Sequence, residues 1–158
     1  MTIWKVRQMM SACDGITSSA HWLSRTSMSL KQYTAQGYEA FQETLKSIGA
    51  GKRIVALFTG SKSLITGQSW CPDCVVADPI IEKVINSQEI QSLDVHFIIV
   101  FVGNREVWKS PDSPFRTDPK LKLTCIPTLL EVNQKAKRLL DSQVANANLV
   151  HDFLADEE

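Results

Sequence analysis

Two runs of apolar residues without polar alternation limit the folds that this chain can adopt. Residues 54–59 are Ile-Val-Ala-Leu-Phe-Thr, and residues 95–102 are Val-His-Phe-Ile-Ile-Val-Phe-Val. Such strands must be covered on both faces of their sheet, because successive side chains point to opposite faces. A helix-like apolar pattern over residues 75–85 connects them. The order predicts a βαβ unit within a larger sheet.

The segments around this unit extend the prediction to one mixed sheet. Apolar residues recur at spacings of three and four over residues 37–48, which predicts a helix. Residues 123–132 and 135–140 predict an antiparallel hairpin. Residues 145–155 predict a closing helix, whose apolar face consists of Leu149, Phe153 and Leu154. We therefore expect an α/β fold with a mixed central β-sheet and helices on both faces.

Composition and charge favour one globular domain that binds proteins or small molecules. The chain has 158 residues, of which 44% are hydrophobic and 22% are charged, so one sizeable core can form. Lys+Arg and Asp+Glu both number 17 and form no block of like charge, which argues against nucleic acid or a membrane surface as the main partner. Four unevenly spaced cysteines are too few for a secreted disulfide framework, so a reducing compartment is expected.

Residues 1–30 differ in composition from the domain that we expect to span residues 31–158. They are rich in Ser, Thr and Met, and they carry Lys5, Arg7 and Arg25 against a single acid. Two interpretations stay open. The segment is either a disordered extension or an organelle presequence, and the second interpretation would make the protein mitochondrial instead of cytoplasmic.

A Cys-x-x-Cys pair, Cys71 and Cys74, lies between the first apolar run and the helix-like pattern that follows it. At a helix start, unpaired backbone N–H groups and the positive end of the dipole would favour the Cys71 thiolate. Pro72 suits the first helical position, where its missing N–H costs nothing, and Asp73 suits the dipole of the first turn. Cys74 lies one turn further on the same face, so its thiol could attack a mixed disulfide on Cys71. The motif predicts a dithiol/disulfide switch.

Zinc binding is the first alternative for this cysteine pair. A zinc site needs a second pair of ligands, and Cys125 with His96 or His151 does not have the matching spacing. We therefore expect no metal site.

Several short motifs together resemble the thioredoxin superfamily. They are a Trp-Cys-x-x-Cys after a strand, a proline five residues beyond the second cysteine (Pro79), and Ile126-Pro127-Thr128 at the start of a later strand. A narrower set, over residues 30–156, resembles the thioredoxin domain-containing protein 17 family, also called Clot-like. That set consists of Phe58-Thr-Gly-Ser-Lys62, Trp70-Cys-Pro-Asp-Cys74, Val102-Gly103, Trp108-Lys109, Phe115-Arg116 and Thr124-x-x-Pro-Thr-Leu-Leu130.

The resemblance implies a thioredoxin fold and the activity of a cytosolic disulfide reductase. Such a protein reduces selected protein disulfides and small disulfides such as cystine. It binds no cofactor and receives electrons from NADPH through thioredoxin reductase. We expect a monomer.

The same resemblance assigns roles to individual residues. Cys71 would be the nucleophile and Cys74 the resolving thiol, while Pro72 and Asp73 would tune the redox potential. Pro127 matches the superfamily's cis-proline, which leaves a backbone edge for an extended substrate. The residues expected to bind substrate are Trp70, Ile126 and Pro127.

The chain departs from thioredoxin beside the resolving cysteine. In thioredoxin a buried acid on the strand before the motif assists that cysteine, and the corresponding place here is Leu57. The run over residues 95–102 offers no lysine to pair with such an acid. Proton transfer at Cys74 would therefore use water, Asp73 or some other group.

Cys125 stands two residues before Pro127, which places it beside the dithiol in this fold. Two interpretations are open. It is either a buried, inert thiol or an exposed one that is glutathionylated or links two chains. The second interpretation predicts a dimer under mild oxidation.

Two other functions remain as alternatives. One is glutaredoxin-like, glutathione-coupled reduction, against which Asp73 argues because an acid there would repel anionic glutathione. The other is a binding module with passive cysteines, in which Trp70, residues 60–69 and Pro127 form a peptide-binding surface.

Overall fold

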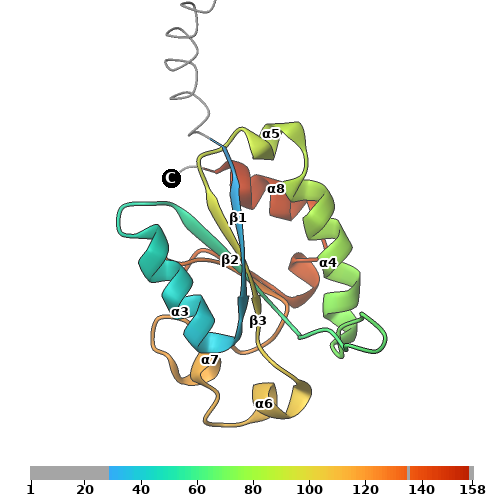
Figure 1. Cartoon of the computed structure of the whole chain (residues 1–158). Helices are drawn as coiled ribbons and strands as arrows, with labels where there is room; N and C mark the ends of the chain where they lie inside the picture. The colour runs from blue at the N-terminus through green and yellow to red at the C-terminus, as the bar shows by residue number, and fades with distance from the viewer. Residues whose placement is uncertain (1–28, 135, 157–158) are drawn as a thin grey trace, which may run out of the picture.

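Five strands form one mixed sheet in the computed structural model, which describes residues 29–134 and 136–156 (Figure 1). The order across the sheet is β1-β3-β2-β4-β5; the first three strands in this order are parallel to one another, and β4 and β5 each run antiparallel to their neighbours. The strands are β1 (Lys31–Gln36), β2 (Ile54–Thr59), β3 (His96–Phe101), β4 (Thr128–Glu131) and β5 (Arg138–Leu140).

Helices cover both faces of the sheet, as predicted. In Figure 1, α3 (Gly37–Ile48) and α7 (Pro114–Thr117) lie on one side, while α4 (Pro72–Ile85) and α8 (Ala147–Ala155) lie on the other. The shorter helices are α5 (Gln88–Gln91), α6 (Arg105–Lys109) and the 3-10 helix η1 (Asp141–Gln143). Within the described part of the chain, no helix is long and apolar enough to cross a membrane.

The central strands β2 and β3 confirm the prediction that strands of this composition are covered on both faces. All six residues of β2 are buried. Ala56 and Phe58 pack on one face, in the cluster that contains Phe41 of α3. Val55 and Leu57 pack on the other face with residues of α4 and α8. Packing against both clusters fixes the end of β2, from which the chain leads to the Cys-x-x-Cys pair.

Strand β1 was not expected. Its sequence is Lys-Gln-Tyr-Thr-Ala-Gln, and only Ala35 is fully buried. It lies at the edge of the sheet, and within the described residues it pairs with β3 alone, so one side of its backbone has no neighbouring strand. Three of its six residues are exposed and two are half-buried. Leu30, just before it, is buried in the core, whereas residues 1–28 of the expected extension lie outside the described residues.

The hairpin and the closing helix are shorter than the sequence pattern predicts. The first hairpin strand covers only residues 128–131, because the Leu123 N–H donates to the Phe115 carbonyl instead of a neighbouring strand. Helix α8 begins after Asn146, whose side chain accepts the Asn148 and Leu149 N–H groups. Of the expected apolar face, Phe153 and Leu154 pack in the core together with Val150, whereas Leu149 is 39% exposed.

Candidate functional site

The chain leaves β2, passes through residues 60–69 and begins α4 at the cysteine pair. Pro72 occupies the first turn of α4, as predicted, and Cys71 is the N-cap with extended backbone angles. The Cys71 sulfur accepts a hydrogen bond from the Cys74 N–H at 3.2 Å. A sulfur therefore takes the position in which a serine or aspartate oxygen usually caps a helix, among N–H groups that favour an anion.

Cys71 and Cys74 form a disulfide, with their Cα atoms 5.2 Å apart. Cys74 has no exposed surface, while Cys71 retains 4%. The Gly60 N–H donates to the Cys74 sulfur at 3.4 Å, and the Cys71 sulfur lies 3.8 Å from the Ile126 carbonyl oxygen. The two sulfurs thus differ in surroundings: Cys71 lies toward the surface beside residue 126, and Cys74 lies against the end of β2.

The segment before the cysteines is fixed by contacts that sequence reasoning did not single out. The Ser69 hydroxyl donates to the Gly60 carbonyl at 2.9 Å and accepts the Cys71 N–H at 3.2 Å. The Trp70 indole N–H donates to the Gly103 carbonyl at 2.9 Å. These hydrogen bonds join the two ends of the loop over residues 60–69 and fix the half-buried Trp70 ring next to Cys71.

The other expected site residues lie around the same point. Ile126 and Pro127 are buried and joined by a cis peptide bond, as the resemblance implied. Pro72 and Asp73 are exposed at the start of α4. Cys125 is a free, half-buried thiol whose sulfur lies 3.9 Å from the Thr128 hydroxyl.

Sequence reasoning missed one ionisable group near the dithiol, Asp78. It is half-buried on α4 and accepts a hydrogen bond from the Thr59 hydroxyl at 2.9 Å. Burial raises the pKa of Asp78 above its usual value, although the Thr59 hydrogen bond and the Lys62 charge oppose this. The spacing of four residues from Cys74 was the available signal, since such residues share one helix face.

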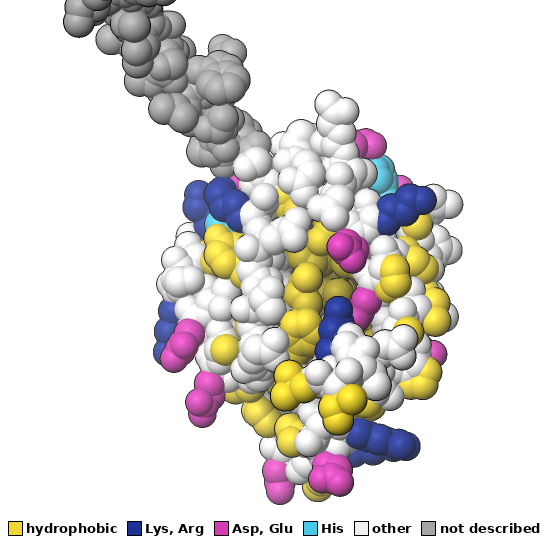
Figure 2. Space-filling view, turned by 45° about the vertical axis from the view of Figure 1, so that its right-hand side comes forward, with side chains coloured by type: hydrophobic (Ala, Val, Ile, Leu, Met, Phe, Trp, Pro, Cys, Tyr) yellow, Lys and Arg dark blue, Asp and Glu magenta, His cyan; other side chains and the backbone are white. Residues whose placement is uncertain are grey.

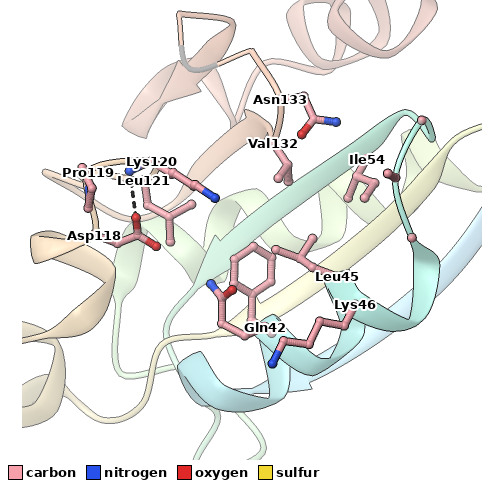
Figure 3. A pocket seen from close by; sticks show the side chains of 14 residues that line it. Gln42, Leu45, Lys46, Ile54, Asp118, Pro119, Lys120, Leu121, Val132 and Asn133 are labelled. Carbon is pink, nitrogen blue, oxygen red and sulfur yellow. Dashed lines mark hydrogen bonds between the residues drawn. The ribbon is translucent and has the colours of Figure 1, made fainter.

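A hollow of about 720 Å³ lies elsewhere, between the end of α3 and residues 118–121. Figure 3 shows Leu45, Ile54, Leu121 and Val132 bordering it, and the Lys120 side chain reaching across its mouth. Neither cysteine of the pair is among its lining residues. Across the described residues, no group of three or more His, Cys, Asp or Glu side chains could hold a metal ion.

Comparison with known proteins matches most of the described part of the chain. A family model described as thioredoxin domain-containing protein 17-like, thioredoxin domain, matches residues 34–156. Thioredoxin domain-containing protein 17 of Mus musculus is 36% identical over 127 residues, which cover 80% of this chain and 97% of that protein. The thioredoxin-like protein Clot of Oryza sativa subsp. japonica is 33% identical over 123 residues, covering 74% of this chain and 88% of that protein. This chain belongs to the thioredoxin domain-containing protein 17-like family.

Proposed function

We propose that this protein is a thiol-disulfide oxidoreductase that reduces selected protein disulfides and small disulfides such as cystine. The observation that carries the proposal is the Cys71 sulfur at the N-cap of α4, paired with Cys74. Helix N–H groups favour the thiolate that disulfide exchange requires. The buried second sulfur is already within bonding reach of the first.

The reaction consists of two exchanges. The Cys71 thiolate attacks one substrate sulfur, the substrate S–S bond breaks, and a substrate thiolate leaves. Cys74 then attacks the Cys71 sulfur of the mixed disulfide and expels the second substrate thiol. Two electrons have passed to the substrate, and the Cys71–Cys74 disulfide remains. The second exchange is intramolecular, so it profits from a high effective concentration.

Substrate would approach beside residue 126. The Ile126 carbonyl lies at the Cys71 sulfur, so an extended substrate can align its backbone there before exchange. Trp70 borders the same approach. We further propose that thioredoxin reductase returns the disulfide to the dithiol with electrons from NADPH, in keeping with membership of this family.

The test is NADPH consumption with thioredoxin reductase and cystine, with the wild type, Cys71→Ser, Cys74→Ser and Cys125→Ser compared. We expect turnover in the wild type and in Cys125→Ser, and none in Cys71→Ser or Cys74→Ser. Full turnover in Cys71→Ser would overturn the proposal. Turnover that requires glutathione and glutathione reductase would instead assign glutaredoxin-like chemistry. No turnover with either system would favour the binding module.

A further inference from the structure

Asp78 occupies an unusual place for a carboxylate. It projects from the second turn of α4 toward the end of β2, where the Thr59 hydroxyl donates to it at 2.9 Å. Thr59 itself is only 1% exposed. A buried hydroxyl that donates to a half-buried acid fixes the direction in which that acid points.

Cys74 meets the same short segment of chain. Its sulfur accepts the N–H of Gly60, the residue directly after Thr59, at 3.4 Å. Cys74 and Asp78 are also four residues apart on α4, so their side chains are neighbours on one helix face. The end of β2 therefore contacts both the Cys74 sulfur and the Asp78 carboxylate, which lie one helical turn apart on α4.

The surroundings of Asp78 suit a proton acceptor. Asp78 lines a hollow of about 260 Å³ between α4 and strands β1 and β3, with Leu57, Ile81 and Ile99 among its apolar lining. Figure 2 shows a hollow on this face, floored by hydrophobic side chains and edged by charged ones of both signs. The charged groups lining it with Asp78 are Lys62 and Glu82. Burial raises the pKa of Asp78, which brings its affinity for protons closer to that needed at neutral pH.

Asp73, the candidate from the sequence for proton transfer at Cys74, is less well placed for that role than Asp78. It is exposed and directly precedes Cys74, and adjacent residues on a helix do not face each other. Leu57 of β2, at the place of thioredoxin's buried acid, lines the same hollow as Asp78. In this protein the carboxylate in that region therefore comes from α4 instead of β2.

We propose that Asp78 accepts the proton of the Cys74 thiol when Cys74 attacks the mixed disulfide on Cys71. The proton moves from sulfur to the carboxylate, the Cys71–Cys74 bond forms, the bond between Cys71 and substrate breaks, and the substrate leaves as a thiolate. Asp78 then releases the proton to that thiolate or to solvent. This role rests on the proposed function, because it belongs to the second of the two exchanges.

Stopped-flow reaction with 5,5′-dithiobis(2-nitrobenzoic acid) separates the two exchanges. Attack by Cys71 releases one coloured thionitrobenzoate, and attack by Cys74 releases another from the mixed disulfide. The full chain with Cys13→Ser and Cys125→Ser serves as the background, so that only the pair reacts. The variants are Asp78→Asn, which can still accept the Thr59 hydrogen bond, Asp78→Glu, and Glu82→Gln as the control for the other acid of the hollow.

We expect Asp78→Asn to leave the first phase unchanged and to slow the second by about tenfold to a hundredfold at neutral pH. The slowed phase should accelerate by about tenfold per pH unit as hydroxide replaces the lost acceptor. A purely structural loss would leave the ratio of the variant's rate to that of the background protein unchanged as the pH rises, whereas a lost proton acceptor makes this ratio recover. Asp78→Glu should restore much of the rate, and Glu82→Gln should match the background protein.

Two results would overturn the role of Asp78. One is a second phase of normal rate in Asp78→Asn, and the other is a slowed phase whose rate relative to the background protein does not recover as the pH rises. Absence of both phases in the background protein would instead contradict the proposed function, so the two failures are distinguishable.

Discussion

Gly60 lies where β2 ends and the chain turns toward the cysteine pair. A β-carbon at this position would lie 2.6 Å from the Ser69 hydroxyl and 3.0 Å from the Cys71 β-carbon. We predict that Gly60→Ala destabilises the oxidised protein by about 2 kcal/mol, because one of these groups must move. The free energy of unfolding, measured by urea denaturation, checks this.

The double variant provides the control. Ser69→Ala removes the nearest clashing atom, so Gly60→Ala should cost less in the Ser69→Ala background than in the wild type. An equal cost in both backgrounds would show that the crowding at Ser69 is not the cause.

The partial exposure of Cys125 predicts an oxidative dimer. Cys125 is a half-buried residue whose free thiol makes a long contact with Thr128. We expect mild oxidation to yield a disulfide-linked dimer, visible on a non-reducing gel, that Cys125→Ser abolishes and Cys13→Ser retains. A dimer that persists in Cys125→Ser would contradict this.

At the scale of single residues, the sequence located the two redox cysteines but not the residues of other elements that lie close to them. Cys71, Pro72 and Cys74 follow from spacing and helix-start chemistry, which are local. Asp78 and Thr59 meet only because α4 folds back along the end of β2, and Asp78 looks like one more surface acid in the sequence. Contacts between elements of this kind need the packing to be known.

At the scale of elements, one buried charge cluster holds the end of α8 against the sheet. Arg53 donates to the carbonyl oxygens of Leu154 at 2.7 Å and Phe153 at 3.1 Å. The same side chain pairs with Glu131 at 3.3 Å, which also pairs with Lys137. The side chains of Arg53 and Glu131 are only 15% and 6% exposed, so solvent screens the pair weakly.

We predict that Arg53→Met lowers the free energy of unfolding by about 3 kcal/mol, because it leaves a buried carboxylate and two carbonyls short of a donor. The matched control is Lys31→Met, at the exposed Lys31–Asp94 pair, which should cost less than about 1 kcal/mol. Equal losses in urea denaturation would contradict the account.

His96 of β3 is hydrogen-bonded to a residue of β1. Its Nδ1 atom is hydrogen-bonded to the Tyr33 hydroxyl at 3.0 Å, and its buried Nε2 has no hydrogen-bond partner in the described part of the chain. Burial lowers the pKa of His96, Lys31 and Lys52 lower it further, and Asp94 opposes them. The folded state therefore binds a proton on His96 less tightly than the unfolded chain does.

Because the pKa of His96 is lower in the folded chain than the value near 6.5 in the unfolded chain, the unfolded chain binds more protons and His96 costs stability as the pH falls through that value. We predict that the loss of stability from about pH 7.5 to about pH 5.5 is smaller in His96→Gln than in the wild type. His151 has a raised pKa, chiefly through its hydrogen bond to Glu89, so His151→Gln should make the loss larger. Equal pH dependence in all three proteins would contradict these assignments.

Sequence patterns predicted elements well where burial decides them. The fully apolar β2 and β3 and the amphipathic α3 appear as expected. The polar edge strand β1 gave no such signal, because its stability comes from backbone pairing with β3 rather than from its side chains. The end of the hairpin strand was misplaced for a similar reason: Leu123 is apolar and buried, yet its backbone bonds outside the sheet.

At the scale of the whole molecule, the sheet order explains why the cysteine pair stands where it does. β2 is the middle strand of five, with β3 on one side and β4 on the other. Its carboxyl end delivers the chain to α4, while the antiparallel β4 brings residues 126 and 127 back to the same edge. Segments 55 residues apart thus meet at the Cys71 sulfur. The resemblance to the thioredoxin superfamily implied this meeting, but the distances needed the structure.

The central claim is that Cys71 attacks the substrate and Cys74 resolves the adduct. The most direct measurement is intact and peptide mass spectrometry of Cys74→Ser after reaction with cystine, with Cys71→Ser as the matched variant. We predict a cysteinyl adduct on Cys71 in Cys74→Ser, its release when thiol is added, and no adduct on Cys74 in Cys71→Ser at the same reaction time. An adduct on Cys125 of Cys74→Ser with Cys71 unmodified, or an adduct on Cys74 of Cys71→Ser at the same reaction time, would contradict the account.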